Sequence, residues 1–213
     1  MTQGTLFGVS VGPGDPELIT LKARNTLAAC PVIAAPRTAG GRTLALDIAA
    51  QAIDLREKTI VYLDFLMTRD EEQLTARRQD LALRLSGYLA QGQDVALLNL
   101  GDASLYSSWS YINELVKTLG YPTATIPGVT SFCAAAASLN TSLTEPEQPL
   151  HIISASYGGL EQSLSLPGTK VLMKAGGSLP QVRQLLQERG LVGKASLAAN
   201  CGLADQVICE RLD

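Results

Sequence analysis

The chain has 213 residues, of which 46% are hydrophobic and 17% charged, and its formal net charge is −3. That length allows one large domain or two small ones, with a core that needs no disulfide or metal to hold it. The acidic balance argues against a nucleic-acid partner, which would require a basic face. It leaves room for an acidic small molecule, because a few arginines in one place suffice to bind one.

The sequence gives little support for a metal site or for a membrane-spanning segment. The four cysteines show no C-x-x-C spacing and the chain has one histidine, His151, so we expect no protein metal site. The N-terminus has neither the basic nor the apolar region of a signal peptide, and no apolar run reaches the ~20 residues of a membrane span. We therefore expect a cytoplasmic protein with reduced thiols.

Apolar runs alternate with helical patterns through the first half, which is typical of a parallel sheet with crossover helices. Strands are expected at 6–11, 32–35, 59–63 and 94–100, and helices at 18–29, 44–53, 70–91 and 112–118. Pro36 is expected to stop the second strand. The charged run of the third helix (Arg77, Arg78, Asp80 and Arg84) is expected to face mostly water.

The pattern changes in the second half, where a connector with two prolines spans 143–149. Strands are expected at 123–126, 150–154, 170–174, 195–199 and 206–209, and helices at 132–138 and 179–189. Some of these strands could pair antiparallel. We expect two α/β domains, residues 1–122 and 123–213.

The opening motif GVSVGPGDPELIT (8–20) looks like a phosphate-binding loop but lacks its chemistry. A dinucleotide fingerprint needs G-x-G-x-x-G, and Glu17 stands in the third glycine position. Pro13 and Pro16 each lack an N–H that a phosphate would use. The motif therefore indicates a functional loop that holds no phosphate.

Four loops with glycine or small polar residues follow predicted strands, at 12–16, 101–106, 127–131 and 173–177. Ligands of open α/β sheets bind at the carboxyl ends of the strands. Each loop alone reads as an ordinary turn. The four together favour a cleft between two domains.

The segments 8–20, GDASLYS (101–107), PGVTSF (127–132) and MKAG (173–176) resemble the tetrapyrrole methyltransferases of cobalamin and sirohaem synthesis. Their order and spacing agree over essentially the whole chain. The stretches 34–42 and 64–70 look most like enzymes that methylate C20 of precorrin-2 or its cobalt form. The resemblance implies a two-domain α/β homodimer with S-adenosylmethionine (SAM) in the interdomain cleft, released as S-adenosylhomocysteine (SAH).

The resemblance also assigns the cofactor positions by motif. They are Gly101, Asp102, Ala103 and Leu105 for the methionine and ribose part, Thr130, Ser131 and Phe132 in a second loop, and Met173 and Lys174 near the adenine. The family commonly has Pro where this chain has Ala103, which restores a backbone N–H. The family also continues through a further C-terminal strand, so an incomplete final sheet is expected here.

The implied reaction needs a weak base, because C20 loses its hydrogen after methylation. Asp15 is the first candidate for base or substrate orienter, and an N-cap of the helix near Leu18 is the equally supported alternative. Tyr106 is the second candidate, with plain packing as its alternative. Because the tetrapyrrole substrate carries many carboxylates, the candidate substrate contacts are Pro13 in the opening loop and the cations Lys22, Arg37 and Arg42, each cation alternatively a surface charge.

Three other functions stay open from the sequence. One is methylation of another tetrapyrrole position, on uroporphyrinogen III or a later precorrin. A second is a nicotinamide oxidoreductase, which the missing third glycine disfavours. The third is a carrier that binds a tetrapyrrole without turnover.

Overall fold

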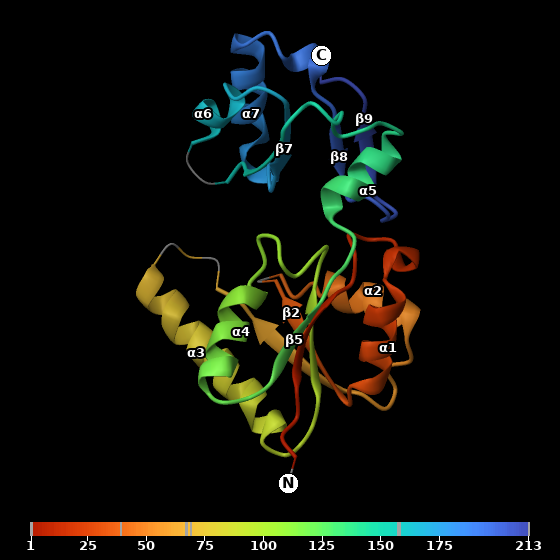
Figure 1. The fold of residues 1–213 in the computed structure, drawn as a ribbon, viewed down its shortest axis with the longest axis vertical. Helices are drawn as coiled ribbons and strands as arrows, with labels where there is room; N and C mark the ends of the chain where they lie inside the picture. Colours follow the sequence, from red (N-terminus) through yellow and green to blue (C-terminus); the bar gives the residue numbers. More distant parts are fainter. Residues whose placement is uncertain (1, 39, 67, 69, 157–158, 213) are drawn as a thin grey trace. The chain divides into compact units, whose positions relative to one another are not determined.

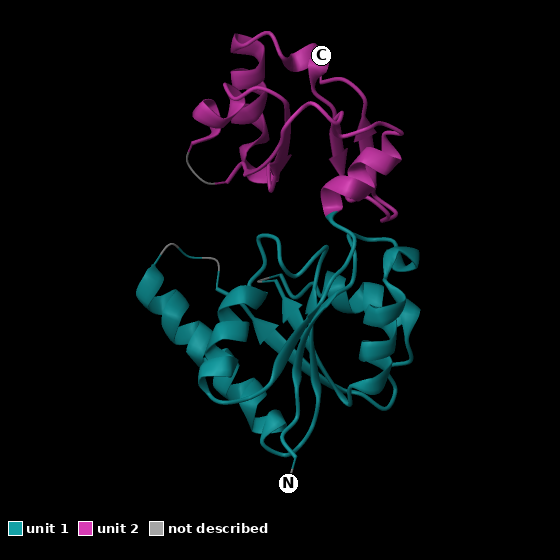
Figure 2. Ribbon diagram, in the orientation of Figure 1, with its two compact units in different colours: residues 1–130 teal, residues 131–213 magenta. Residues whose placement is uncertain are grey.

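The computed structural model describes residues 2–38, 40–66, 68, 70–156 and 159–212 of the chain (Figure 1). The chain forms two compact α/β units, unit 1 with residues 1–130 and unit 2 with residues 131–213 (Figure 2). The α/β fold class is thus as expected. The division falls after Thr130 rather than after residue 122, because β5 (Thr123–Ile126) pairs with β1 (Leu6–Ser10) in the sheet of unit 1.

Unit 1 is built on a five-stranded sheet with the strand order β3-β2-β4-β1-β5. Its other strands are β2 (Val32–Arg37), β3 (Thr59–Asp64) and β4 (Val95–Asn99), and every neighbouring pair is parallel. All five residues of β4 are buried, as its apolar run predicts for a strand covered on both faces.

Helices cover both faces of this sheet (Figure 1). α1 (Leu21–Ala29) and α2 (Leu44–Ala52) pack on one face, and α3 (Glu71–Leu89) and α4 (Trp109–Thr118) on the other, each layer with its own apolar cluster. The adjacent strands β1 and β4 lead to helices on opposite faces. Their carboxyl ends therefore flank the switch point at which open α/β sheets bind ligands.

Several predicted boundaries in unit 1 differ from those observed, and α4, for example, begins at Trp109 rather than at residue 112. Two of the differences have a clear physical reason. β2 does not stop before Pro36 but runs to Arg37, because it pairs with β4 only through Ala34 and beyond that point has β3 as its partner. A strand with one open side tolerates the missing N–H of proline. The helix expected at 18–29 is a 3-10 turn, η1 (Pro16–Leu18), followed by α1, which Thr20 caps by accepting a hydrogen bond from Ala23 N–H at 3.1 Å.

Two arginines of α3 bind the backbone of the edge strand β3. Arg84 Nη1 donates to the Tyr62 carbonyl at 3.0 Å, and Arg77 Nε donates to the Asp64 carbonyl at 2.8 Å. A third, Arg78, stacks its guanidinium 3.7 Å from the centre of the Tyr111 ring. The expectation of a mainly solvated face holds for Arg84, which is exposed, and is wrong for Arg77 and Arg78, which are partly buried.

Unit 2 has two small sheets. Its elements are α5 (Ser131–Ser138), β6 (Leu150–Ser154), α6 (Leu160–Leu164), β7 (Thr169–Met173), η2 (Gly176–Ser178), α7 (Leu179–Glu188), η3 (Val192–Lys194), β8 (Leu197–Ala199) and β9 (Val207–Cys209). β6 and β7 pair in parallel, and β8 and β9 antiparallel. Among the described helices of both units, none combines the length and apolar content that a membrane crossing requires.

Candidate functional site

The loops that follow β1 and β4 are joined by backbone hydrogen bonds at the carboxyl edge of the sheet. Gly12 and Gly101 form an antiparallel bridge, in which Gly101 N–H donates to the Gly12 carbonyl at 2.8 Å. Their φ angles are +75° and +71°, a region that glycine enters without the penalty a side chain brings. Both glycines are therefore required by the turn in which the two loops meet.

Asp102 ties the loop after β4 to the loop after β5. Its Oδ1 accepts hydrogen bonds from the backbone N–H of Ser104, at 2.8 Å, and from the Ser104 hydroxyl. Its Oδ2 accepts from Gly128 N–H at 2.8 Å. Burial acts to raise the pKa of Asp102, but these hydrogen bonds outweigh it and leave the pKa below its ordinary value. The carboxylate therefore stays ionised and holds two loops together.

Ser10 and Ala103 form a second tie beneath this loop. Ala103 N–H donates to Ser10 Oγ at 2.9 Å, and both residues are buried. A proline in place of Ala103 could not make this bond. The N–H of Ala103 is thus matched by a hydroxyl on β1. Sequence reasoning missed Ser10, although a polar residue inside the apolar run Val9–Val11 was a visible signal.

Gly128 packs so closely that no side chain fits. A Cβ at this position would lie 2.5 Å from Ser10 Cβ and 2.8 Å from the Gly101 carbonyl oxygen. This contact holds the loop after β5 against the other two. Gly128 lies within the predicted 127–131 loop, but its role as the hydrogen-bond partner of Asp102 was not foreseen.

Tyr106 is held in a strained backbone conformation. Its φ is +47°, which is unusual for a residue with a bulky side chain, and the residue is 44% exposed. Just beyond it, Ser107 Oγ donates to Asn99 Oδ1 at 2.7 Å and accepts from Trp109 N–H at 3.1 Å. These bonds anchor the end of the loop after β4 to the start of α4.

The structure confirms a capping role for Asp15. Its Oδ1 accepts a hydrogen bond from Glu17 N–H at 2.8 Å, so Asp15 caps the η1 turn rather than α1. Its neighbour Pro13 is buried. The role of Asp15 as a base stays a prediction.

The three cationic residues predicted to contact the substrate differ in their surroundings. Lys22, in the first turn of α1, is exposed. Arg42 is also exposed, and its backbone closes a turn with Thr38. Arg37, the last residue of β2, makes a two-pronged ion pair with Asp64, the last residue of β3.

One predicted cofactor segment contains a buried hydroxyl, Thr130 Oγ1 in unit 1, without a hydrogen-bond partner among the described residues. A second such hydroxyl, Ser154 Oγ in unit 2, lies outside the predicted segments but stands opposite Met173 in the β6–β7 register. Such groups fit a ligand that brings its own donors and acceptors.

The residue after Met173, Lys174, has a φ of +56°, and its carbonyl accepts from Ser156 Oγ at 2.8 Å. Ser131 and Phe132 form the first turn of α5. The structure thus gathers the loops after β1, β4 and β5 in unit 1, and places Ser131, Phe132, Met173 and Lys174 in unit 2. In the 64–70 stretch, Met67 and Arg69 lie outside the described residues.

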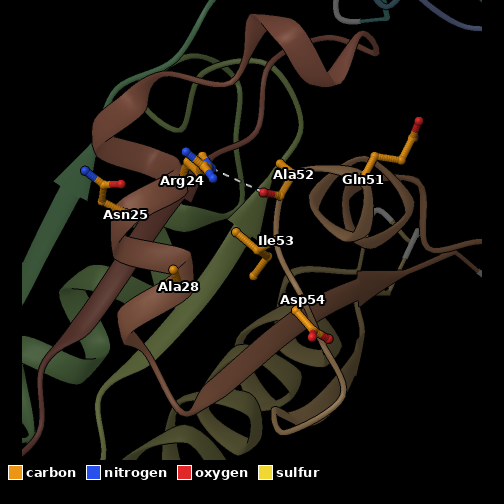
Figure 3. Close-up of a pocket in the computed structure, with 7 residues that line it drawn as sticks. All are labelled: Arg24, Asn25, Ala28, Gln51, Ala52, Ile53 and Asp54. Carbon is orange, nitrogen blue, oxygen red and sulfur yellow. Dashed lines mark hydrogen bonds between the residues drawn. The ribbon is translucent and has the colours of Figure 1, made fainter.

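A surface hollow of about 390 Å³ lies between α1 and α2, away from these loops (Figure 3). It is lined by Arg24, Asn25, Ala28, Gln51, Ala52, Ile53 and Asp54, and Arg24 Nε donates across it to the Ala52 carbonyl at 3.4 Å. None of these residues belongs to the predicted site. The described residues also contain no group of three or more His, Cys, Asp or Glu that could hold a metal ion.

Comparison with known proteins places the chain in a family. A family model for tetrapyrrole (corrin/porphyrin) methylases matches residues 5–212. The cobalt-precorrin-2 C(20)-methyltransferase of Salmonella typhimurium is 34% identical over 206 residues, which cover 94% of this chain and 85% of that protein.

Two solved structures share the fold. A cobalt precorrin-4 methyltransferase superposes with a TM-score of 0.75 at 21% identity, covering 96% of this chain and 83% of that one. A uroporphyrin-III C-methyl transferase from Thermus thermophilus, complexed with S-adenosylhomocysteine, has a TM-score of 0.70 at 24% identity, with 98% and 84% covered. With the family model spanning nearly its whole length, this chain belongs to the tetrapyrrole (corrin/porphyrin) methylases.

Proposed function

We propose that this protein methylates C20 of precorrin-2, or of its cobalt form, with SAM as the methyl donor, in cobalamin biosynthesis. The observation that carries the proposal is the 34% identity to a cobalt-precorrin-2 C(20)-methyltransferase over 94% of the chain. The gathered loops at the carboxyl edge of the unit 1 sheet support it, because ligands of such sheets bind there.

We assign the cofactor to the positions that the motifs give. In unit 1 these are Gly101, Asp102, Ala103, Leu105 and Thr130, and in unit 2 they are Ser131, Phe132, Met173 and Lys174. When bound, SAM supplies an electrophilic methyl group and leaves as a neutral thioether, so the leaving group needs no acid. The hydroxyls of Thr130 and Ser154, which have no hydrogen-bond partner among the described residues, suit the uncharged ribose and adenine.

The bonds seen here change the role proposed for Asp102. Both carboxylate oxygens already accept hydrogen bonds from the protein, so Asp102 acts on the cofactor mainly by fixing the Ser104 and Gly128 backbones. Fixing two reactants in line can contribute about 7–11 kcal/mol to a reaction. Rigid loops are therefore the main catalytic contribution that we ascribe to unit 1.

The proton on C20 needs an acceptor after methylation, and Asp15 and Tyr106 remain the candidates. Asp15 uses Oδ1 to cap η1, and Oδ2 accepts no hydrogen bond from the described residues. Tyr106 is exposed in a loop whose ends are anchored. Pro13, Lys22, Arg37 and Arg42 are carried forward as substrate contacts.

The test is turnover with purified protein. Incubation with SAM and precorrin-2, or its cobalt form, under anaerobic reducing conditions should add one methyl group, and NMR of the product should place it on C20. Methylation of a different carbon would support the second candidate, another tetrapyrrole position, which the fold shared with precorrin-4 and uroporphyrin-III enzymes favours. Absence of any methylated tetrapyrrole would contradict both.

We also propose a cytoplasmic homodimer, a state implied by the family resemblance. Light scattering of the purified protein should give twice the 22.5 kDa mass of the chain. A mass equal to that of one chain at micromolar concentration would contradict the dimer.

A further inference from the structure

Arg37 and Asp64 form an ion pair at the carboxyl edge of the unit 1 sheet. They stand opposite each other as the last residues of the parallel strands β2 and β3. Arg37 Nε donates to Asp64 Oδ1 and Arg37 Nη2 to Asp64 Oδ2, each at 2.8 Å. This two-pronged geometry fixes the plane of the guanidinium as well as its position.

The ion pair leaves one edge of the guanidinium open. A guanidinium carries five N–H donors, and Asp64 occupies the Nε side. Among the described residues, none accepts a hydrogen bond from Nη1. The Arg37 side chain is 40% exposed and Tyr62 lies beneath it, with the guanidinium carbon 5.3 Å from the ring centre. Arg37 is thus oriented by two neighbours while its outer edge remains able to bind a second carboxylate.

The location of Arg37 suits the substrate better than the cofactor. β2 neighbours β4, so Arg37 stands at the same edge as the loop that begins at Gly101. It lies on the β2–β3 side of β4, whereas the ties made by Asp102 and Ser10 join the loops after β4, β1 and β5. Arg37 therefore lies beside the predicted cofactor loops and outside their hydrogen-bonded centre.

We propose that Arg37 determines substrate specificity by binding a tetrapyrrole carboxylate through its outer Nη1–Nη2 edge, with Asp64 and Tyr62 as positioning residues. The inference rests on the proposed function and names the group that recognises the substrate. Asp64 has two effects. It holds the Arg37 guanidinium in place, and it offsets the positive charge of Arg37 before the substrate binds. Lysine could supply the charge but not the planar fork.

The test compares variants of Arg37 with a matched ion pair elsewhere. Arg37→Ala should raise the KM for the tetrapyrrole tenfold or more, as expected for a lost charged hydrogen-bond pair, with kcat and SAM affinity changed less than about twofold. Arg37→Lys should recover only part of that loss, and Asp64→Asn should raise KM several-fold. The control is Arg56→Ala, which breaks the exposed Arg56–Asp54 pair before β3 and should leave every constant unchanged.

A salt titration separates a direct contact from a structural effect. The KM of the wild type should rise with ionic strength more steeply than that of Arg37→Ala, because the variant has lost a charge–charge contact. Thermal melts of the variants should match the wild type within a few degrees, since an exposed ion pair contributes little to stability.

Distinct outcomes decide this inference and the proposed function separately. An unchanged tetrapyrrole KM in Arg37→Ala, or a loss confined to the affinity for SAM and its methionine carboxylate, would overturn the role of Arg37 and leave methylation standing. If the wild type shows no turnover, the proposed function fails, and fluorescence titration with uroporphyrin, a stable polycarboxylate porphyrin, still decides the assignment. Equal uroporphyrin affinity in wild type and Arg37→Ala would then overturn it.

Discussion

Ser10 and Ala103 show how a side chain far away in the sequence can satisfy a buried backbone N–H. Ser10 Oγ accepts a hydrogen bond from the Ala103 N–H, a donor that a proline at this position would lack. Both residues are buried, so water does not reach this bond. A buried N–H without a partner costs about 1–3 kcal/mol, so the two positions should depend on each other.

We expect Ser10→Ala to lower the free energy of unfolding by about 1–3 kcal/mol, because it leaves the Ala103 N–H unpaired. The double variant Ser10→Ala/Ala103→Pro removes both partners and should recover part of that loss. Urea unfolding of the two single variants and the double variant measures the coupling. Strict additivity would show that the hydrogen bond does not matter.

Asp102 gives a second prediction at the scale of the residue. Asp102→Ala frees the N–H groups of Ser104 and Gly128 and should weaken SAH binding at least tenfold by calorimetry. Asp80→Ala, which removes an exposed carboxylate from α3, is the matched control. Equal SAH affinity in wild type and Asp102→Ala would rule out the loop-fixing role.

The pKa of Asp102 sets the pH window of its effect on stability. Because the pKa is lower in the folded protein, the unfolded chain binds the proton more readily, and the stabilisation is complete above the ordinary value of about 3.9. It is lost as the pH falls through the lowered pKa. The stability gap between wild type and Asp102→Ala should therefore be constant from pH 7 to 5 and narrow toward pH 3.

Replacing a glycine should have opposite effects in a tightly packed loop and in an exposed part of a helix. Gly128→Ala would force a Cβ against Ser10 and the Gly101 carbonyl, so we expect a loss of about 1–3 kcal/mol from overpacking and weaker SAH binding. Gly87 lies inside α3, and a Cβ there meets nothing within 4 Å. Gly87→Ala should stabilise the protein by up to about 1 kcal/mol. Thermal melts that rank the two variants the other way would contradict this packing.

The sequence predicts elements well where the pattern is local. β5 and β6 have the expected bounds, and the α3 N-cap at Asp70 matches the expected start of that helix. α6 was not expected, because five residues are too few to show a helical period. The strand past Pro36 depends on which neighbour β2 keeps, and no local pattern carries that information.

The same limit applies to the candidate site. Motifs predicted the loops, but the bonds that join them, from Asp102 to Gly128 and from Ala103 to Ser10, connect residues far apart in sequence. Such pairings come from strand order. The pairing of Arg37 with Asp64 likewise follows from the β2–β3 register.

At the scale of the whole molecule, the two units differ in the core that they can form. Unit 1 has an apolar cluster on each face of a five-stranded sheet, whereas unit 2 has one smaller cluster around Leu160, Val182 and Leu185. A larger core supports independent folding.

We expect residues 1–130 to fold cooperatively when produced alone, with a helical circular dichroism spectrum and a single thermal transition. This fragment should not bind SAH, because Met173 and Lys174 are absent from it. In the full chain, SAH at a hundred times its Kd should stabilise by about 2.7 kcal/mol. A fragment that binds SAH as tightly as the full chain would contradict the assignment of cofactor contacts to unit 2.

The arginines that reach β3 from α3 also affect how readily this molecule aggregates in a concentrated solution. An edge strand with open carbonyl groups is a template on which another chain can add a strand, the first step of many aggregates. Arg77 and Arg84 already occupy two of those carbonyls, at Asp64 and Tyr62. A change that releases α3 would expose both the apolar underside of the helix and an edge able to recruit a second copy. Protection of the β3 edge against the addition of a strand from another chain is thus a property of the same helix that completes the core.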